Sequence, residues 1–111
     1  MTACAERGVS APPEVVFNTA TDPDRTSAWL PEQVRGTTTT ARPAATADDL
    51  RARWGAETGW PVALQVHPGE AGGAMVRLEL AGDVPHDELA ELAKASLVNL
   101  AREVADNLTP G

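Results

Sequence analysis

The chain of 111 residues lacks isoleucine and tyrosine, and it contains a single phenylalanine, Phe17, and a single cysteine, Cys4. One cysteine excludes an internal disulfide, so packing alone must hold the fold together. Of the 47 hydrophobic residues, 20 are alanine, which leaves 27 larger apolar side chains. Because this supply suffices for one layer of helix on sheet, we expect residues 1–111 to form a single domain.

Basic residues are also scarce. Nine Lys and Arg face sixteen Asp and Glu, which gives a net charge of −7. Nucleic-acid binding relies on basic patches, so we expect no nucleic-acid partner. No stretch approaches the roughly 20 apolar residues that cross a bilayer, so we expect no membrane insertion. Glu6 and Arg7 lie where a signal peptide would carry an apolar run, which predicts a cytoplasmic protein. The bias toward Ala, Gly, Pro and Arg is typical of a GC-rich bacterial genome.

A long helix is predicted near the C-terminus, over residues 85–108. Apolar residues recur there at steps of three and four, the spacing of one helix face. Asp87 and Glu88 suit the positive end of the helix dipole, and Pro110 ends the helix. A helix of about 22 residues spans roughly 33 Å, so we expect it to cross the whole molecule as its main hydrophobic cover.

Two segments before this helix alternate between apolar and polar residues, which predicts strands with one buried face. They cover residues 62–66 and 76–80, and the turn-forming stretch 68–73 between them indicates an antiparallel hairpin. Residues 50–54 alternate in the same way and predict a third strand.

The first third of the chain predicts two short helices. One covers residues 14–20, and the other follows Pro23 and ends before Pro31. Residues 37–40 are four threonines, which suit an edge strand and a loop equally, since the residues after them are small, polar and interrupted by proline. We therefore regard residues 37–48 as a candidate flexible segment.

The opening of the chain carries a more specific signal. Residues 10–17 read Ser-Ala-Pro-Pro-Glu-Val-Val-Phe, and Thr-Asp-Pro-Asp-Arg at 21–25 is followed by Trp-Leu-Pro at 29–31. This pattern resembles the start of the START-like (SRPBCC) superfamily, the polyketide-cyclase and lipid-transfer proteins with the helix-grip fold. The resemblance implies an α+β fold in which an antiparallel sheet of about three to six strands packs on the long C-terminal helix. It also implies a cavity for a hydrophobic ligand between sheet and helix.

The chain departs from this family in ways that shorten the sheet. The family's first strand precedes the first helix, yet residues 1–9 have weak strand character and are a second candidate flexible segment. Residues 37–48 lie where the family carries more sheet. A shortened sheet leaves the cavity smaller, open, or completed by a second chain. Because exposed strand edges are liabilities that a dimer hides, we hypothesise a homodimer.

The predicted ligand-binding residues share the apolar face of these elements. The three tryptophans either line a pocket or fill core space that isoleucine and tyrosine do not supply here. Apolar pockets with few polar groups are the usual form of a small-ligand site. The predicted residues are Trp29, Trp54, Trp60, Leu64, Val66, Leu78, Leu97 and Leu100.

Polar residues indicate no metal site and no catalytic group. His67 and His86 have no second ligand at metal-binding spacing. Cys4 lies in the N-terminal arm, whereas a catalytic thiolate needs a fixed electropositive setting. We therefore predict no metal, no cofactor and no catalytic residue, and the pattern does not decide whether the protein is an enzyme.

Three functions remain open. The first is a non-catalytic carrier or sensor that binds a small hydrophobic or aromatic molecule between the sheet and the last helix. The second is an enzyme of the polyketide aromatase/cyclase type. Its candidate polar groups, His67, Arg77 and Glu79, are expected on the sheet face opposite the pocket, which argues against it. The third is a protein-interaction module of the chaperone-activator type, whose acidic surface meets a basic partner.

Overall fold

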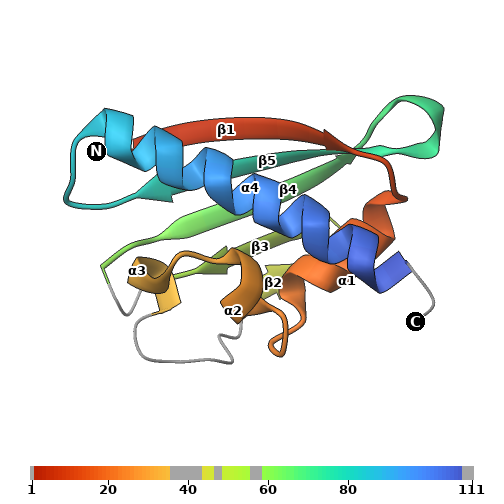
Figure 1. The fold of residues 1–111 in the computed structure, drawn as a ribbon, viewed down its shortest axis with the longest axis horizontal. Coiled ribbons are helices and arrows are strands. Elements are labelled where there is room, and N and C mark those ends of the chain that lie inside the picture. Colours follow the sequence, from red (N-terminus) through yellow and green to blue (C-terminus); the bar gives the residue numbers. More distant parts are fainter. Residues whose placement is uncertain (1, 36–43, 47–48, 56–58, 109–111) are drawn as a thin grey trace.

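The computed structural model describes residues 2–35, 44–46, 49–55 and 59–108, and Figure 1 shows its arrangement. One strand comes first, three short helices follow it, four further strands come next, and a long helix ends the described part. In chain order the elements are β1 (Thr2–Val9), α1 (Pro13–Thr21), α2 (Thr26–Trp29), α3 (Glu32–Arg35), β2 (Ala44–Thr46), β3 (Arg51–Trp54), β4 (Val62–Pro68), a 3₁₀ turn (Glu70–Gly72), β5 (Ala74–Ala81) and α4 (His86–Leu108).

The strands form one antiparallel sheet in the order β1-β5-β4-β3-β2. The predicted hairpin is confirmed as β4 and β5, with Leu64 directly opposite Leu78. Alternate residues of β5 are buried and exposed along its length, as the period-two pattern requires. The sheet therefore has one apolar inner face and one polar outer face.

The helix α4 covers the inner face of the sheet. Its 23 residues correspond to about 35 Å, against a longest molecular dimension of 37 Å, so it crosses nearly the whole molecule as predicted. It packs most extensively on β1 and also contacts α2, β5 and α1, and Figure 1 shows it running diagonally over the sheet. Within the described ranges, no helix has the length and apolarity needed to cross a membrane.

The core lies between the sheet and the helices. Each large apolar side chain that is fully buried contributes about 1.5–3 kcal/mol to folding, so this layer dominates the stability. The largest side chains with almost no exposed surface are Trp29, Leu64, Leu78, Leu80, Leu89, Leu100, Val16, Val76 and Val104.

The N-terminal segment departs from the prediction. Residues 1–9 were expected to have weak strand character and to be flexible, but residues 2–9 form β1 and pair with β5 along their whole length. The local pattern is weak because Ala3 and Ala5 are small. The strand is stabilised by its pairing and by the packing of α4, and strand propensity reflects such context more than an intrinsic preference.

The region between α1 and β3 also differs in detail. Three short helices occur where two were predicted, because α3 follows directly after Pro31. The second helix ends before Pro31 as expected but begins at Thr26, since Pro23 lies in a turn that Asp22 stabilises by accepting the Asp24 N–H at 2.9 Å. Within the predicted flexible segment 37–48, residues 44–46 form β2, whose three residues are too few to carry a sequence pattern. Residues 37–40 lie outside the described part.

A matched pair of substitutions tests the packing of α4. Leu97 is 3% exposed and its neighbour Val98 is 40% exposed. We expect Leu97→Asp to lower the free energy of unfolding by several kcal/mol, about 3 or more, because it buries an unpaired charge. Val98→Asp should change it by less than about 0.5 kcal/mol. Urea denaturation measures both, and equal effects would contradict the assigned face of α4.

Candidate functional site

The predicted ligand-binding residues converge on the inner layer from five elements. All except Trp60 are buried, with exposed fractions of 5% or less. They come from α2, β3, β4, β5 and α4, so the structure brings together side chains that lie far apart in the sequence. Their shared environment is the apolar space between the sheet and the helices.

Two of the tryptophans form a pair in this layer. The rings of Trp29 and Trp54 lie 5.3 Å apart between centroids and are nearly perpendicular, at 83°. Such edge-to-face pairs are favourable because the positive edge of one ring meets the negative face of the other. The pair ties α2 to the end of β3.

The indole N–H groups of Trp29 and Trp54 differ in their hydrogen bonding. Trp29 Nε1 donates to the backbone carbonyl of Ala20 at 3.3 Å. Trp54 Nε1 is buried, and it has no hydrogen-bond partner among the residues that the structure describes. A buried donor without a partner costs about 1–3 kcal/mol, and buried indole N–H groups usually find an acceptor. Trp54 therefore presents an unused donor inside an apolar layer.

Trp60 closes a corner at the end of the sheet. Its backbone N–H donates to the carbonyl of Gly55 at 3.1 Å, and its ring lies against Gly82, where any Cβ would overlap it. Gly55 has a φ of +83°, the left-handed region that favours glycine. The half-buried Trp60 thus packs at the margin of the core, apart from the Trp29–Trp54 pair.

The remaining polar groups of the layer are satisfied locally. Among the described residues, the buried side chains classed as polar are Thr19, Thr26 and Ser96. Each hydroxyl donates to a backbone carbonyl three or four residues earlier in the chain, at 2.8, 3.0 and 2.7 Å respectively. No ionisable side chain is buried in the described part, so the inner layer offers no acid or base.

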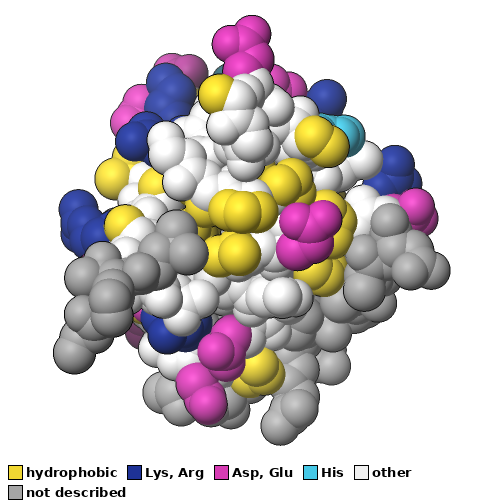
Figure 2. All heavy atoms as spheres, turned by 90° about the vertical axis from the view of Figure 1, so that its right-hand side faces the viewer, with side chains coloured by type: hydrophobic (Ala, Val, Ile, Leu, Met, Phe, Trp, Pro, Cys, Tyr) yellow, Lys and Arg dark blue, Asp and Glu magenta, His cyan; other side chains and the backbone are white. Residues whose placement is uncertain are grey.

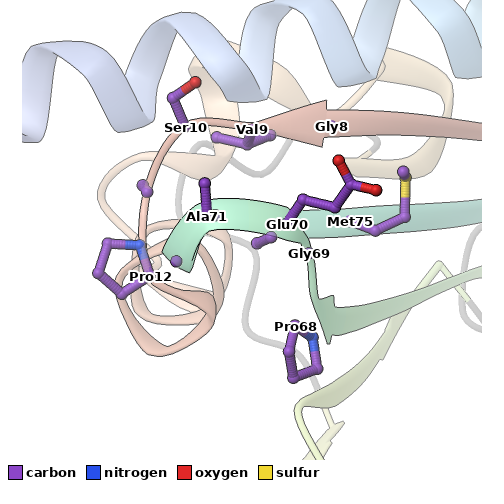
Figure 3. A pocket seen from close by; sticks show the side chains of 13 residues that line it. Gly8, Val9, Ser10, Pro12, Pro68, Gly69, Glu70, Ala71 and Met75 are labelled. Carbon is purple, nitrogen blue, oxygen red and sulfur yellow. The ribbon is translucent and has the colours of Figure 1, made fainter.

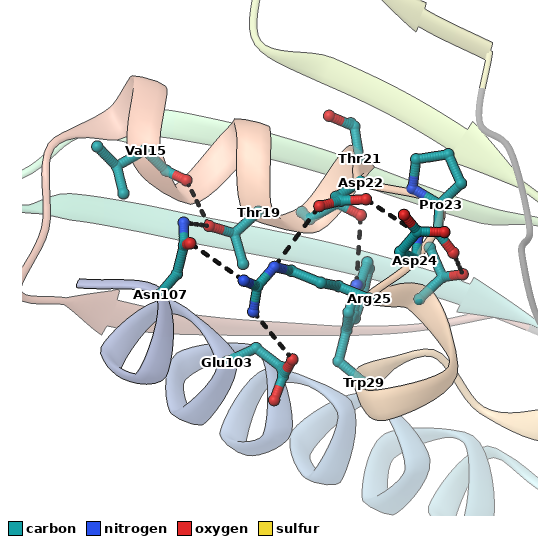
Figure 4. Close-up of polar contacts among 12 residues, drawn as sticks. Val15, Thr19, Thr21, Asp22, Pro23, Asp24, Arg25, Trp29, Glu103 and Asn107 are labelled. Atoms are coloured by element: carbon teal, nitrogen blue, oxygen red, sulfur yellow. Dashed lines mark hydrogen bonds and ion pairs between the residues drawn. The ribbon is translucent and has the colours of Figure 1, made fainter. Parts of the chain in front are cut away.

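A polar cluster fastens the short helices to the end of α4 (Figure 4). The guanidinium of Arg25 lies 3.4 Å from Glu103 and 3.5 Å from Asp22, and it donates to Asn107 Oδ1 at 3.1 Å. Asn107 Nδ2 in turn donates to Thr19 Oγ1 at 3.2 Å. These contacts connect α1, the α1–α2 turn and the last turns of α4.

The predicted cyclase-type polar groups lie on the opposite side of the sheet. His67, Arg77 and Glu79 are exposed on the outer face, as the alternation predicts. Arg77 lies 3.4 Å from Glu79 and 3.9 Å from Glu6. The pKa of Arg77 is raised above its ordinary value, first by the charge and hydrogen bond of Cys4 and then by Glu79 and Glu6.

His86 and the remaining candidate metal ligands form no centre. The Nδ1 atom of exposed His86 lies 3.2 Å from the carbonyl of Thr2, a contact that joins the start of α4 to β1. Within the part of the chain that the structure describes, no three His, Cys, Asp or Glu side chains are grouped closely enough to hold a metal ion.

A large open groove lies at one end of the molecule. It has a volume of about 940 Å³ and is formed by the β1–α1 connection and the β4–β5 turn (Figure 3). Its polar side chains, Ser10 and Glu70, are exposed. Figure 2 shows this end, where hydrophobic side chains gather at the centre and charged ones surround them. The groove has no buried polar group that would orient a ligand.

Comparisons with known proteins bear on the fold. No family model matches the chain, and a comparison with curated proteins finds no match either. Among solved structures, TTHA0849 from Thermus thermophilus is 20% identical, with a TM-score of 0.72 over 98% of this chain and 100% of that one. Protein CV1439 from Chromobacterium violaceum is also 20% identical, with a TM-score of 0.64 over 93% and 96% of the two chains. Ara h 8.0201 is 13% identical, with a TM-score of 0.59 over 96% of each chain.

The chain has the helix-grip fold. The likeness extends over nearly the full length of each chain, and at these identities it bears on the fold alone. In this helix-grip domain the five described strands fall within the expected three to six, and α4 is held against the inner face.

The sequence pattern does not distinguish one tryptophan from another. It placed Trp29, Trp54 and Trp60 in one set, but only the three-dimensional arrangement shows which indole lacks an acceptor. The alternation of residues 50–54 likewise presents Arg51 and Arg53 only as the polar side of a strand. Their i, i+2 spacing around Ala52 was the available signal that two guanidinium groups share one face.

The Arg25 cluster gives a test of how α4 is held. We expect Arg25→Ala to lower the free energy of unfolding by about 1 kcal/mol, because a partly buried ion pair and its hydrogen bonds are lost. Arg102→Ala, which removes an exposed arginine from α4, should cost less than about 0.5 kcal/mol. A double-mutant cycle with Glu103→Ala should give a coupling energy of about 0.5–1 kcal/mol. A coupling of zero in urea denaturation would contradict the role of the pair.

Proposed function

We propose that this protein is a non-catalytic carrier or sensor that binds a small hydrophobic or aromatic molecule in the inner layer, beside Trp54. The ligand carries a hydrogen-bond acceptor, such as a carbonyl oxygen, that pairs with Trp54 Nε1. The unpartnered, buried indole N–H is the observation that carries this proposal. The predicted residues Trp29, Leu64, Val66, Leu78, Leu97 and Leu100 supply the surrounding apolar surface, and Trp60 lies at its margin.

The energetic reason lies in the cost of the unused donor. A buried donor without a partner costs about 1–3 kcal/mol, and a ligand oxygen that pairs with it recovers this cost. The surroundings of Trp54 are otherwise apolar, so the one polar interaction selects for the acceptor while burial of apolar surface supplies the affinity. The site would therefore prefer a carbonyl compound over a hydrocarbon of the same shape.

Access to Trp54 depends on the elements that cover it. The long helix α4 packs mainly on β1, at the other side of the sheet from β3, and it also contacts α2, β5 and α1. The elements nearest to Trp54 are α2, through Trp29, and α3, whose Val34 lies close to Gly55. Both helices have four residues, and one turn of helix has little stability of its own. We infer that the ligand enters by displacement of α2 and α3, while α4 stays in place.

Binding is favoured over catalysis by the chemistry of the layer. Dehydration or cyclisation requires a group that moves a proton at the reacting atom. The described buried side chains include none, and His67, Arg77 and Glu79 lie on the outer face. We therefore propose a binding protein rather than an enzyme.

A matched pair of ligands tests the role of the indole. We expect 9-fluorenone, which carries a carbonyl oxygen, to bind about tenfold more tightly than fluorene, which has the same shape without it. Trp54→Phe removes the donor and should bring this ratio close to one, whereas Trp60→Phe should preserve it. Thermal-shift titration measures the affinities, and a ligand at about 100 times its Kd adds about 2.7 kcal/mol of stability.

Two results would contradict this proposal. One is a fluorenone-to-fluorene ratio that Trp54→Phe leaves unchanged, which would place the acceptor elsewhere. The other is the absence of any saturable shift with fatty acids, flavonoids and aromatic polyketides as well, which would mean that the layer is a closed core.

The homodimer remains a prediction of its own. In the described sheet, β1 and β2 are the outermost strands, and unpaired backbone groups on such edges favour association with another chain. Light scattering at micromolar concentration should give the mass of two chains. A mass of 11.6 kDa, that of one chain, would contradict it.

A further inference from the structure

A second hollow lies on the outer face of the sheet, away from the inner layer. It has a volume of about 220 Å³ and is formed by β3, β4 and β5. Ala63 lies near its middle, with Arg53 directly opposite on β3 and Glu79 directly opposite on β5. The small side chain of Ala63 leaves a depression between the long side chains of its neighbours.

The rim of this hollow is rich in guanidinium groups. Two residues along β4 from Ala63, Gln65 lies opposite Arg51 on one side and opposite Arg77 on the other. Three arginines thus surround the hollow, against one carboxylate, Glu79. This local excess of positive charge occurs in a chain whose net charge is −7.

The three arginines differ in their ion pairs and hydrogen bonds. Arg77 is neutralised by Glu79 and Glu6, at 3.4 and 3.9 Å. With the Gln65 side-chain amide oriented so that its oxygen faces Arg51, Nε and Nη2 of Arg51 both donate to that oxygen at 3.0 Å. These hydrogen bonds fix the guanidinium without neutralising its charge. Arg53 has no carboxylate within 4.0 Å among the described residues. Two uncompensated guanidinium groups therefore face the hollow from one strand.

We propose that this hollow binds a small oxyanion, a carboxylate or phosphate group, through Arg53 and Arg51. A guanidinium presents parallel N–H donors that match the two oxygens of such a group, and these charge-assisted hydrogen bonds are stronger than neutral ones. The ligand must be small, because the acidic surface of the rest of the chain repels an extended polyanion. Glu79, at the rim, opposes the ligand's charge and limits the affinity.

The proposal is tested by titrating the full chain with inorganic phosphate and, separately, with succinate at low ionic strength. Backbone amide shifts of β3, β4 and β5 in two-dimensional NMR report binding. We expect saturable shifts confined to the residues of the hollow, with a Kd on the order of 1 mM. Tighter binding of phosphate or of succinate identifies which oxyanion the hollow prefers.

Charge variants on the rim move the affinity in opposite directions. Arg53→Gln should weaken binding about tenfold, because a charge-assisted contact is lost. Glu79→Gln should strengthen it by about two- to fivefold, because it removes an opposing charge. Arg102→Gln, an exposed position on α4, changes the net charge by the same amount as Arg53→Gln and should leave the Kd unchanged.

The outcomes separate a defined site from general charge attraction. Equal weakening of anion binding by Arg53→Gln and Arg102→Gln would overturn the proposal. Amide shifts that do not saturate with either anion would overturn it as well. Thermal midpoints of all variants, which should agree with that of the unchanged chain, show that the fold is retained. Because the hollow and the Trp54 site lie on opposite faces of the sheet, either can fail without the other.

Discussion

The packing of α4 against β1 and β5 organises the whole domain. It buries one face of a helix as long as the molecule, and it converts a segment with weak strand character into a paired strand. Small residues on both sides, among them Ala3 and Ala93, are almost completely buried in this contact region. Because a chain of this size has few large apolar residues, the domain concentrates its hydrophobic burial in this single layer.

The two sides of the sheet are therefore covered by helices of very different length. Over β1 and β5 the cover is a continuous helix, further held by the Arg25 cluster at its C-terminal end. Over β3 the described cover consists of two helices of one turn each. Because one turn of helix has little stability of its own, the proposed ligand entry lies in this second region. The unpartnered Trp54 indole lies in that region.

The main elements could be predicted from the sequence because each carries its own periodicity. The steps of three and four in residues 85–108 and the alternation in β4 and β5 depend on neighbours within the segment, so α4 and the hairpin were placed correctly. The strand β1 could not be predicted from the sequence, because its stability comes from β5 and α4, which are remote in sequence. Likewise, the alternation placed Leu64 and Leu78 on the inner face. The hydrogen bonding of the Trp29 and Trp54 indoles and the gathering of arginines from two strands depend on tertiary contacts that no local pattern records.

The most direct test of the ligand site is the indole resonance of Trp54. In a ¹⁵N-labelled chain, addition of 9-fluorenone should shift the Trp54 Nε1–H signal downfield to saturation and slow its exchange with solvent, while the Trp29 indole, already bonded to Ala20, changes less. This would show that a ligand acceptor occupies the unused donor. If the Trp54 signal stays in place at ligand concentrations that saturate binding, the indole does not contact the ligand, and the proposed site is wrong.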